Sequence, residues 1–113
     1  MSARKRIDPG WTWDDDFNMS QAIEIGNTIY VSGQVSMDSA GNVVGPGDMQ
    51  AQTRQALENI KTVLESAGSS MADVVKITVF MTDISLLRDT HQVRAEFFPD
   101  PPPASTGIEI SAL

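Results

Sequence analysis

Hydrophobic and polar residues alternate along residues 28–35, which is the pattern of a β-strand with one buried face. A shorter apolar run at residues 22–25 precedes this segment, and Gly26 and Asn27 between the two are typical turn residues. The two segments therefore predict an antiparallel hairpin. Its apolar row contains Ile29, Val31 and Val35, and its polar row contains Thr28, Tyr30, Ser32 and Gln34.

Residues 38–47 contain three glycines and a proline, which predicts a loop, and a helical pattern follows this loop. Asp48 is expected to cap this helix, because its carboxylate can accept hydrogen bonds from free backbone N–H groups of the first turn. Gly68 suits the position after the last turn, since glycine adopts positive φ without steric cost. The apolar stripe is Ala56, Leu57, Ile60, Val63, Leu64 and Ala67.

The longest predicted strand covers residues 73–84, where alternation returns. A second helix is expected near residues 85–98, and Pro99 with the prolines at 101–103 would end it. A last strand is expected from about Ser105 to Leu113. The strand at 73–84 has one row of Val75, Ile77, Val79 and Met81 and another of Val74, Lys76, Thr78, Phe80 and Thr82.

This order of elements predicts an α+β fold in which one twisted mixed sheet carries two helices on one face. The other face would hold Tyr30, Thr78 and Phe80, which are too apolar in places to stay fully hydrated, so we expect it to mediate oligomerisation. The chain is expected to form a single domain over residues 1–113, with an irregular N-terminal segment at 1–18.

Composition narrows the functional classes. With 113 residues, a net charge of -7 and no cysteine, the chain offers no disulfide, no thiol nucleophile and no general affinity for nucleic acid. No hydrophobic run is long enough to cross a membrane, and the N-terminus lacks the apolar core of a signal peptide, so a cytoplasmic location is expected. Residues 14–16 are three aspartates, which we interpret as a solvated turn and not as a metal site.

Several segments, taken in order, resemble the Rid family, also called the YjgF, RidA or L-PSP proteins. They are SQA at 20–22, GNTIYVSGQ at 26–34, QTRQALENI at 52–60, DVVKITVFMTD at 73–83, AEFF at 95–98 and PASTG at 103–107. The resemblance implies a chorismate-mutase-like fold, a homotrimer with ligand clefts between subunits, and no metal or organic cofactor. It also implies enamine/imine deaminase chemistry on small metabolites, while some relatives are described as endoribonucleases or translation inhibitors.

The residues expected to bind the ligand are Met19, Ser32, Gly33, Ser105, Thr106 and Gly107, and no catalytic residue is assigned. Ser32 and Gly33 match the family's cleft, but Ser105 replaces the arginine that holds a substrate carboxylate in the deaminases. Gly107 replaces a cysteine, and Met19 a tyrosine that borders the cleft. The family's further C-terminal strand, with a glutamate thought to position water, is absent from the sequence after Leu113.

Several of these residues could instead have simpler roles. Ser105 and Thr106 could merely begin a strand after the prolines, and Ser32 could be a sheet residue at a subunit contact. Arg54 or Arg94 could replace the missing guanidinium, or form ion pairs on a helix surface. His91 and Glu109 are expected on the surface, and Trp11 and Trp13 either cover the cleft or pack on the hairpin.

The leading hypothesis is a Rid-family homotrimer that binds a small carbonyl- or imine-like metabolite and acts as a deaminase-type hydrolase of altered substrate range. The alternative is a noncatalytic interaction or chaperone-like trimer. Ribonuclease action has the least support, because the sequence has no basic groove and only one histidine.

Overall fold

The computed structural model describes residues 3–11 and 15–113, so the expectations for Trp13 and Asp14 lie outside the described residues. The strands are β1 (Lys5–Ile7), β2 (Ala22–Ile25), β3 (Thr28–Val31), β4 (Lys76–Met81) and β5 (Ala104–Glu109). The α-helices are α1 (Met49–Ser66) and α2 (Leu87–Phe97), and short 3₁₀ turns lie at Asp15–Phe17, Met71–Asp73 and Ile84–Leu86.

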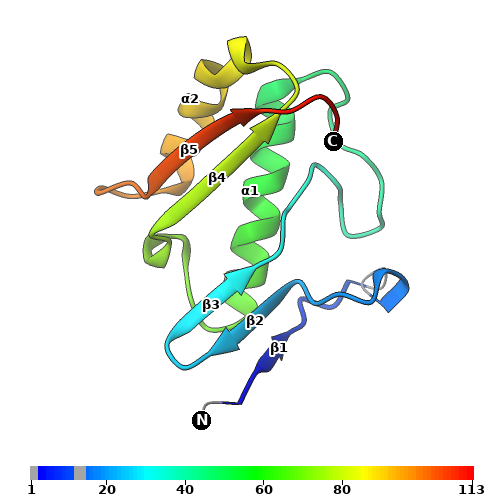
Figure 1. Ribbon diagram of the computed structural model, residues 1–113, viewed down its shortest axis with the longest axis vertical. Coiled ribbons are helices and arrows are strands. Elements are labelled where there is room, and N and C mark those ends of the chain that lie inside the picture. The colour runs from blue at the N-terminus through cyan, green and yellow to red at the C-terminus, as the bar shows by residue number, and fades with distance from the viewer. Residues whose placement is uncertain (1–2, 12–14) are drawn as a thin grey trace.

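The strands form a mixed sheet layer with both helices behind it, which confirms the predicted α+β fold (Figure 1). Hydrogen bonds divide this layer into two parts, an antiparallel group in the order β1-β2-β3 and a parallel pair β4-β5. In β4–β5, Ile77 lies opposite Ser105 and Thr78 opposite Thr106. This register decides which face each candidate residue occupies.

Helix α1 begins and ends as the sequence predicts. The Asp48 carboxylate accepts a hydrogen bond from Ala51 N–H at 3.1 Å, which satisfies one free donor of the first turn. At the other end Gly68 has φ +78°, its N–H donates to Glu65 O, and Ser69 N–H donates to Leu64 O. These two bonds form a Schellman motif, which satisfies carbonyl groups that the helix itself leaves free.

The core lies between the sheet layer and the helices. Leu57 and Leu64 of α1 pack with Val93 of α2, and Ile29 and Ile77 bring β3 and β4 against the same cluster. Burial of each large apolar side chain contributes roughly 1.5–3 kcal/mol before the entropy cost of folding. Both parts of the layer therefore share one hydrophobic core, although hydrogen bonds do not join them within the described residues.

The structure corrects several predicted boundaries. The segment at 1–18 is not entirely irregular, because β1 pairs with β2 and buries Ile7 against Ala22 and Val63. Strand β3 ends at Val31, and β4 is shorter than the predicted 73–84 because 3₁₀ turns occupy both of its flanks. Val74 packs on the core whereas Val75 is exposed, so the predicted alternation is wrong at these two residues. The last strand ends at Glu109.

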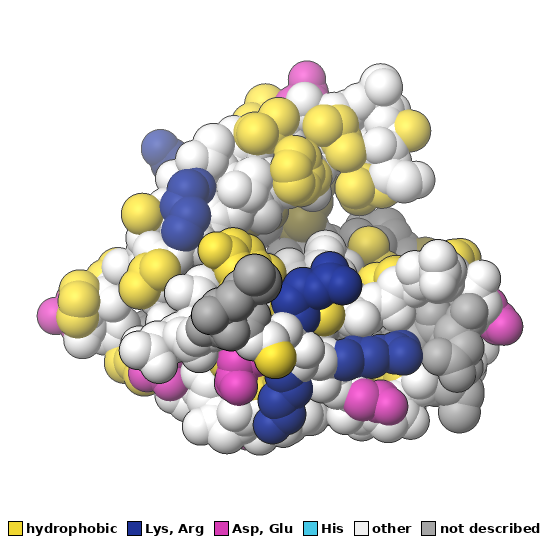
Figure 2. All heavy atoms as spheres, turned by 60° about the horizontal axis from the view of Figure 1, so that its bottom comes forward, with side chains coloured by type: hydrophobic (Ala, Val, Ile, Leu, Met, Phe, Trp, Pro, Cys, Tyr) yellow, Lys and Arg dark blue, Asp and Glu magenta, His cyan; other side chains and the backbone are white. Residues whose placement is uncertain are grey.

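The face away from the helices is apolar in part, as predicted. Tyr30 on β3 is 64% exposed, Phe80 on β4 is 53% exposed, and Ile108 lies opposite Phe80 on β5 and is also exposed. Hydrophobic side chains gather in the upper part of Figure 2, beside a hollow in the surface. Within the described residues, neither α-helix has the length and apolar character of a membrane span.

Candidate functional site

Among the residues that the structure describes, strand β5 pairs with β4 through one edge and has a free edge on its other side. Ala104 N–H donates to Val75 O at 3.0 Å and Ile110 N–H donates to Met81 O at 2.8 Å, so the even-numbered residues of this stretch bond toward β4. Because backbone groups alternate along a strand, the N–H and C=O groups of Ser105, Gly107 and Glu109 point away from β4. The segment predicted to bind a ligand therefore offers unpaired strand donors.

Ser105 and Thr106 lie on opposite faces of this strand. Ser105 shares its row with Ile77, which packs on the core, although Ser105 itself is exposed at the edge of the sheet. Thr106 lies on the open face, where its Oγ1 accepts a hydrogen bond from Lys76 Nζ at 2.9 Å. The same ammonium donates to Ile77 O at 2.8 Å. Lys76 is thus a cation within the candidate site that the sequence analysis did not assign.

Gly107 has a structural role beside its predicted ligand role. A Cβ atom at this position would lie 3.1 Å from Leu87 Cδ1 and 3.8 Å from Ile84 Cδ1. The first distance is shorter than ordinary packing distances, so glycine lets the turn before α2 pack directly on β5. That turn is held by Asp83 and by Glu109, whose carboxylate accepts Ile84 N–H at 3.0 Å. Hydrogen bonds from the Ser85 side chain and backbone lower the pKa of Asp83.

We call Ser105, Thr106 and Gly107 the β5 wall of the candidate site. Met19, Ser32 and Gly33 form its other wall, the β3 wall. Ser32 Oγ donates to Ser20 O at 2.7 Å, and Ser32 N–H donates to Gln21 O at 2.9 Å, so the end of β3 holds the segment that contains Met19. A Cβ at Gly33 would meet nothing within 4 Å, which leaves its backbone open to a ligand. The Ser32 hydroxyl also has a structural role, because it already donates to the chain.

One copy of the chain does not bring the two walls together. Ser32 and Gly33 follow β3 in the three-stranded group, whereas Ser105–Gly107 lie in β5, and β4 lies between β5 and β3 in Figure 1. The predicted residues therefore form two separate surfaces in one chain. A single cleft that contains both surfaces requires a second copy.

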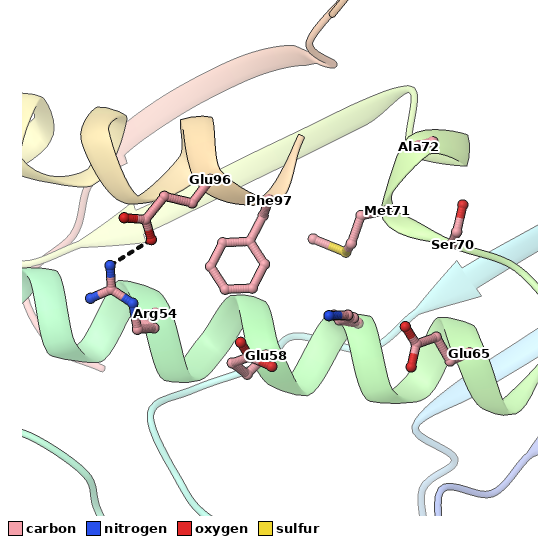
Figure 3. A pocket seen from close by; sticks show the side chains of 9 residues that line it. Arg54, Glu58, Glu65, Ser70, Met71, Ala72, Glu96 and Phe97 are labelled. Atoms are coloured by element: carbon pink, nitrogen blue, oxygen red, sulfur yellow. Dashed lines mark hydrogen bonds and ion pairs between the residues drawn. The ribbon is translucent and has the colours of Figure 1, made fainter. Parts of the chain in front are cut away.

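A hollow of about 410 Å³ lies between the two helices, and none of the residues that line it belongs to either wall (Figure 3). Phe97 and Met71 point into it, and an ion pair between Arg54 and Glu96 joins the two helices at one end of it. Glu58 and Glu65 also line it, so the acidic side chains outnumber the basic ones. This hollow is a poor site for an anionic metabolite.

The remaining candidates have simpler roles. Arg54 pairs with Glu96, and Arg94 is partly buried on α2, where burial lowers its pKa. His91 is exposed, and Trp11 packs on the cluster of Ile7, Ala22 and Val63.

A second hollow, of about 200 Å³, is lined by Arg6, Asn18, Met19 and Ser20. Within residues 3–11 and 15–113, no group of acidic or histidine side chains has the arrangement of a metal site.

Comparisons with known proteins identify the family to which this chain belongs. A family model described as Endoribonuclease L-PSP matches residues 16–113. A RutC family protein of Sulfurisphaera tokodaii is 47% identical over 94 residues, which cover 83% of this chain and 75% of the relative. A 2-iminobutanoate/2-iminopropanoate deaminase of Dermatophagoides farinae is 36% identical over 94 residues, which cover 83% and 73%.

Solved structures agree with the sequence relatives. The Rid-family protein YyfA of Yersinia pestis superposes with a TM-score of 0.91 at 34% identity and covers 98% of this chain and 89% of its own. RidA of the Antarctic bacterium Psychrobacter sp. superposes with a TM-score of 0.80 at 38% identity and covers 84% and 76%. The chain therefore belongs to the Rid (YjgF, endoribonuclease L-PSP) family and has its chorismate-mutase-like α+β fold.

Proposed function

We propose that this protein binds a small carbonyl- or imine-like metabolite in clefts between copies of the chain, as a deaminase-type hydrolase of altered substrate range. The observation that carries the proposal is the separation of the two candidate walls. Ser32 and Gly33 follow β3, while the free edge of Ser105 and Gly107 belongs to β5. Each wall is open in one copy, and each would be completed by the other wall of a neighbour.

The proposed assembly is a homotrimer, which the family resemblance implies. Support comes from the open sheet face, where Tyr30, Phe80 and Ile108 leave large apolar side chains exposed. A neighbouring copy that covers this face would remove apolar surface from water, at roughly 25 cal/mol for each Å² buried. The same contact would place the β5 edge of one copy near the β3 wall of another.

The proposed chemistry is hydrolysis of a C=N bond. Water adds across the imine, its oxygen to the carbon and one of its protons to the nitrogen. The hydroxyl of this carbinolamine then loses its proton as the C=O bond forms and the C–N bond breaks, and the nitrogen takes up that proton, through a positioned group or water, and leaves as ammonia. The free N–H groups of Ser105 and Gly107 are suited to orient a polar substrate atom at the strand edge. A relative at 36% identity carries the name 2-iminobutanoate/2-iminopropanoate deaminase, which supports this class of reaction.

Ser105 is expected to limit this activity. An arginine could hold a substrate carboxylate with two charged hydrogen bonds, whereas a serine donates one neutral bond. A hydrogen bond to a charged group contributes about 1.5–3 kcal/mol, which corresponds to roughly tenfold to 150-fold in affinity. We therefore expect the protein to act more weakly on 2-imino acids than a variant that carries arginine at position 105.

The test compares hydrolysis of 2-iminobutanoate by the purified protein and by Ser105→Arg. The variant should raise kcat/KM by about tenfold or more. Ser111→Arg is the matched control, because it adds the same charge at an exposed residue beyond β5. Equal activity of the unmodified protein and Ser105→Arg would show that Ser105 does not limit the reaction.

The exposed apolar face also favours one second candidate, a noncatalytic interaction trimer. A thermal-shift screen with small acids, ketones and amides separates the two functions. Stabilisation by a subset of these compounds supports the metabolite-binding function. No stabilisation across the whole set, together with no imine hydrolysis by Ser105→Arg, supports the interaction function.

A further inference from the structure

Lys76 is a charged group that has no acidic partner in the described part of the chain. Its Nζ donates to Thr106 Oγ1 and to Ile77 O, which are both neutral acceptors. Among the residues that the structure describes, the ion pair between Arg54 and Glu96 is on the helices, and no ion pair includes Lys76. An ammonium group carries three protons, so one proton of Lys76 remains for another acceptor.

Thr106 adds a second donor beside this ammonium. Its Oγ1 accepts from Lys76, and within the described part of the chain its hydroxyl hydrogen has no acceptor. A hydroxyl can accept and donate at the same time. The free proton of Lys76 and the hydroxyl hydrogen of Thr106 therefore form a pair of donors whose heavy atoms lie 2.9 Å apart on the open face of β4 and β5.

We propose that Lys76 and Thr106 together bind the carboxylate of the ligand. A carboxylate has two acceptor oxygens, and a charged donor next to a hydroxyl donor complements them. The proposal narrows the substrate class to small 2-oxo or 2-imino monocarboxylates, and it rests on the metabolite-binding function proposed above. Lys76 would thereby provide the positive charge that Ser105 cannot.

Arg54 and Arg94, the two arginines considered in place of the missing guanidinium, are less suited to this role. Arg54 is neutralised by Glu96, and both lie on the helices, on the opposite side of the sheet layer from Thr106. Arg94 is also on α2. The chain carries a net charge of -7, so a small anion is repelled overall and needs a local cation to bind. Lys76 is the cation in contact with a residue of the β5 wall.

The experiment titrates the full-length, isotope-labelled protein with 2-oxobutanoate and with butanone, and follows binding by NMR. Butanone is the matched probe, because it has a similar ketone but no carboxylate. Lys76→Met keeps most of the side-chain length and removes the charge, while Thr106→Val removes the hydroxyl. Lys61→Met is the control, because Lys61 is an exposed lysine on α1 that lines only the hollow between the helices.

Lys76→Met should weaken 2-oxobutanoate binding by about tenfold or more, and Thr106→Val by about threefold to tenfold. Neither variant should change butanone binding, and Lys61→Met should match the unmodified protein. Binding of 2-oxobutanoate by Lys76→Met within twofold of the unmodified protein would overturn the carboxylate site and leave the proposed function standing. Failure of the unmodified protein to bind either probe would overturn both.

Discussion

At the scale of single residues, the position of a side chain on its strand decides its role. Ser105 and Thr106 are neighbours in the sequence, yet the register with Ile77 and Thr78 places them on opposite faces of β5. Thr106 accepts a hydrogen bond from Lys76 on the open face, whereas Ser105 offers its backbone N–H and C=O groups at the free edge of β5. Two residues that the sequence analysis treated as one ligand-binding pair are therefore separate functional groups.

Gly107 and Gly33 give a prediction that separates packing from ligand access. Gly107→Val should destabilise the fold by about 1–3 kcal/mol, because the new side chain meets Leu87 and Ile84. Gly33→Val is the matched control, since a Cβ there meets nothing within 4 Å and the residue does not have a positive φ. Urea unfolding measures both. Equal stability of the two variants would contradict the packing role of Gly107.

The sequence could predict only part of the candidate site, for reasons visible in particular residues. It placed Lys76 in the same row as Thr78 and Phe80, which the exposure of these residues confirms. The sequence did not indicate that the Lys76 side chain hydrogen-bonds to Thr106. That contact depends on the pairing of β4 with β5, and the two residues are thirty positions apart in the chain. Likewise, the contact that constrains Gly107 comes from Leu87, on a different element.

At the scale of elements, local chemistry determines where helices and strands end. Helix α1 agrees with its prediction because both ends carry their own signals, Asp48 at one and Gly68 at the other. The strands agree less well. Strand β1 was missed because it is only three residues long and largely polar. Only its pairing with β2 and the burial of Ile7 define it. Such tertiary effects are not encoded in a local pattern.

The cap of α1 provides the prediction at this scale. Asp48→Ala should lower the free energy of unfolding by about 0.5–2 kcal/mol, because Ala51 N–H loses its acceptor at the positive end of the helix. Glu58→Ala removes the same charge from an exposed position in the middle of α1 and serves as the control. Chemical denaturation monitored by circular dichroism measures the difference. Equal midpoints for the two variants would contradict the capping role.

At the scale of the whole molecule, the fold and the site have different requirements. One copy suffices for the core, because α1 and α2 cover both parts of the sheet layer. One copy does not suffice for the proposed cleft, since the walls at Ser32 and Ser105 lie on strands of different groups. The apolar face with Tyr30 and Phe80 supports assembly through the side opposite the helices. Assembly would then complete the site.

The most direct test of a cleft shared between copies is complementation between two defective variants. Gly33→Trp should block the β3 wall, and Lys76→Met should remove the charge on β4 beside the β5 wall, so neither variant alone should bind 2-oxobutanoate well. The two variants are unfolded together, refolded as mixed oligomers, and titrated with 2-oxobutanoate, with light scattering to establish their mass. Random mixing should restore roughly a quarter of the clefts, because these receive one intact wall from each variant. No recovered binding in mixed oligomers, or a monomeric mass for the unmodified protein, would contradict the shared cleft.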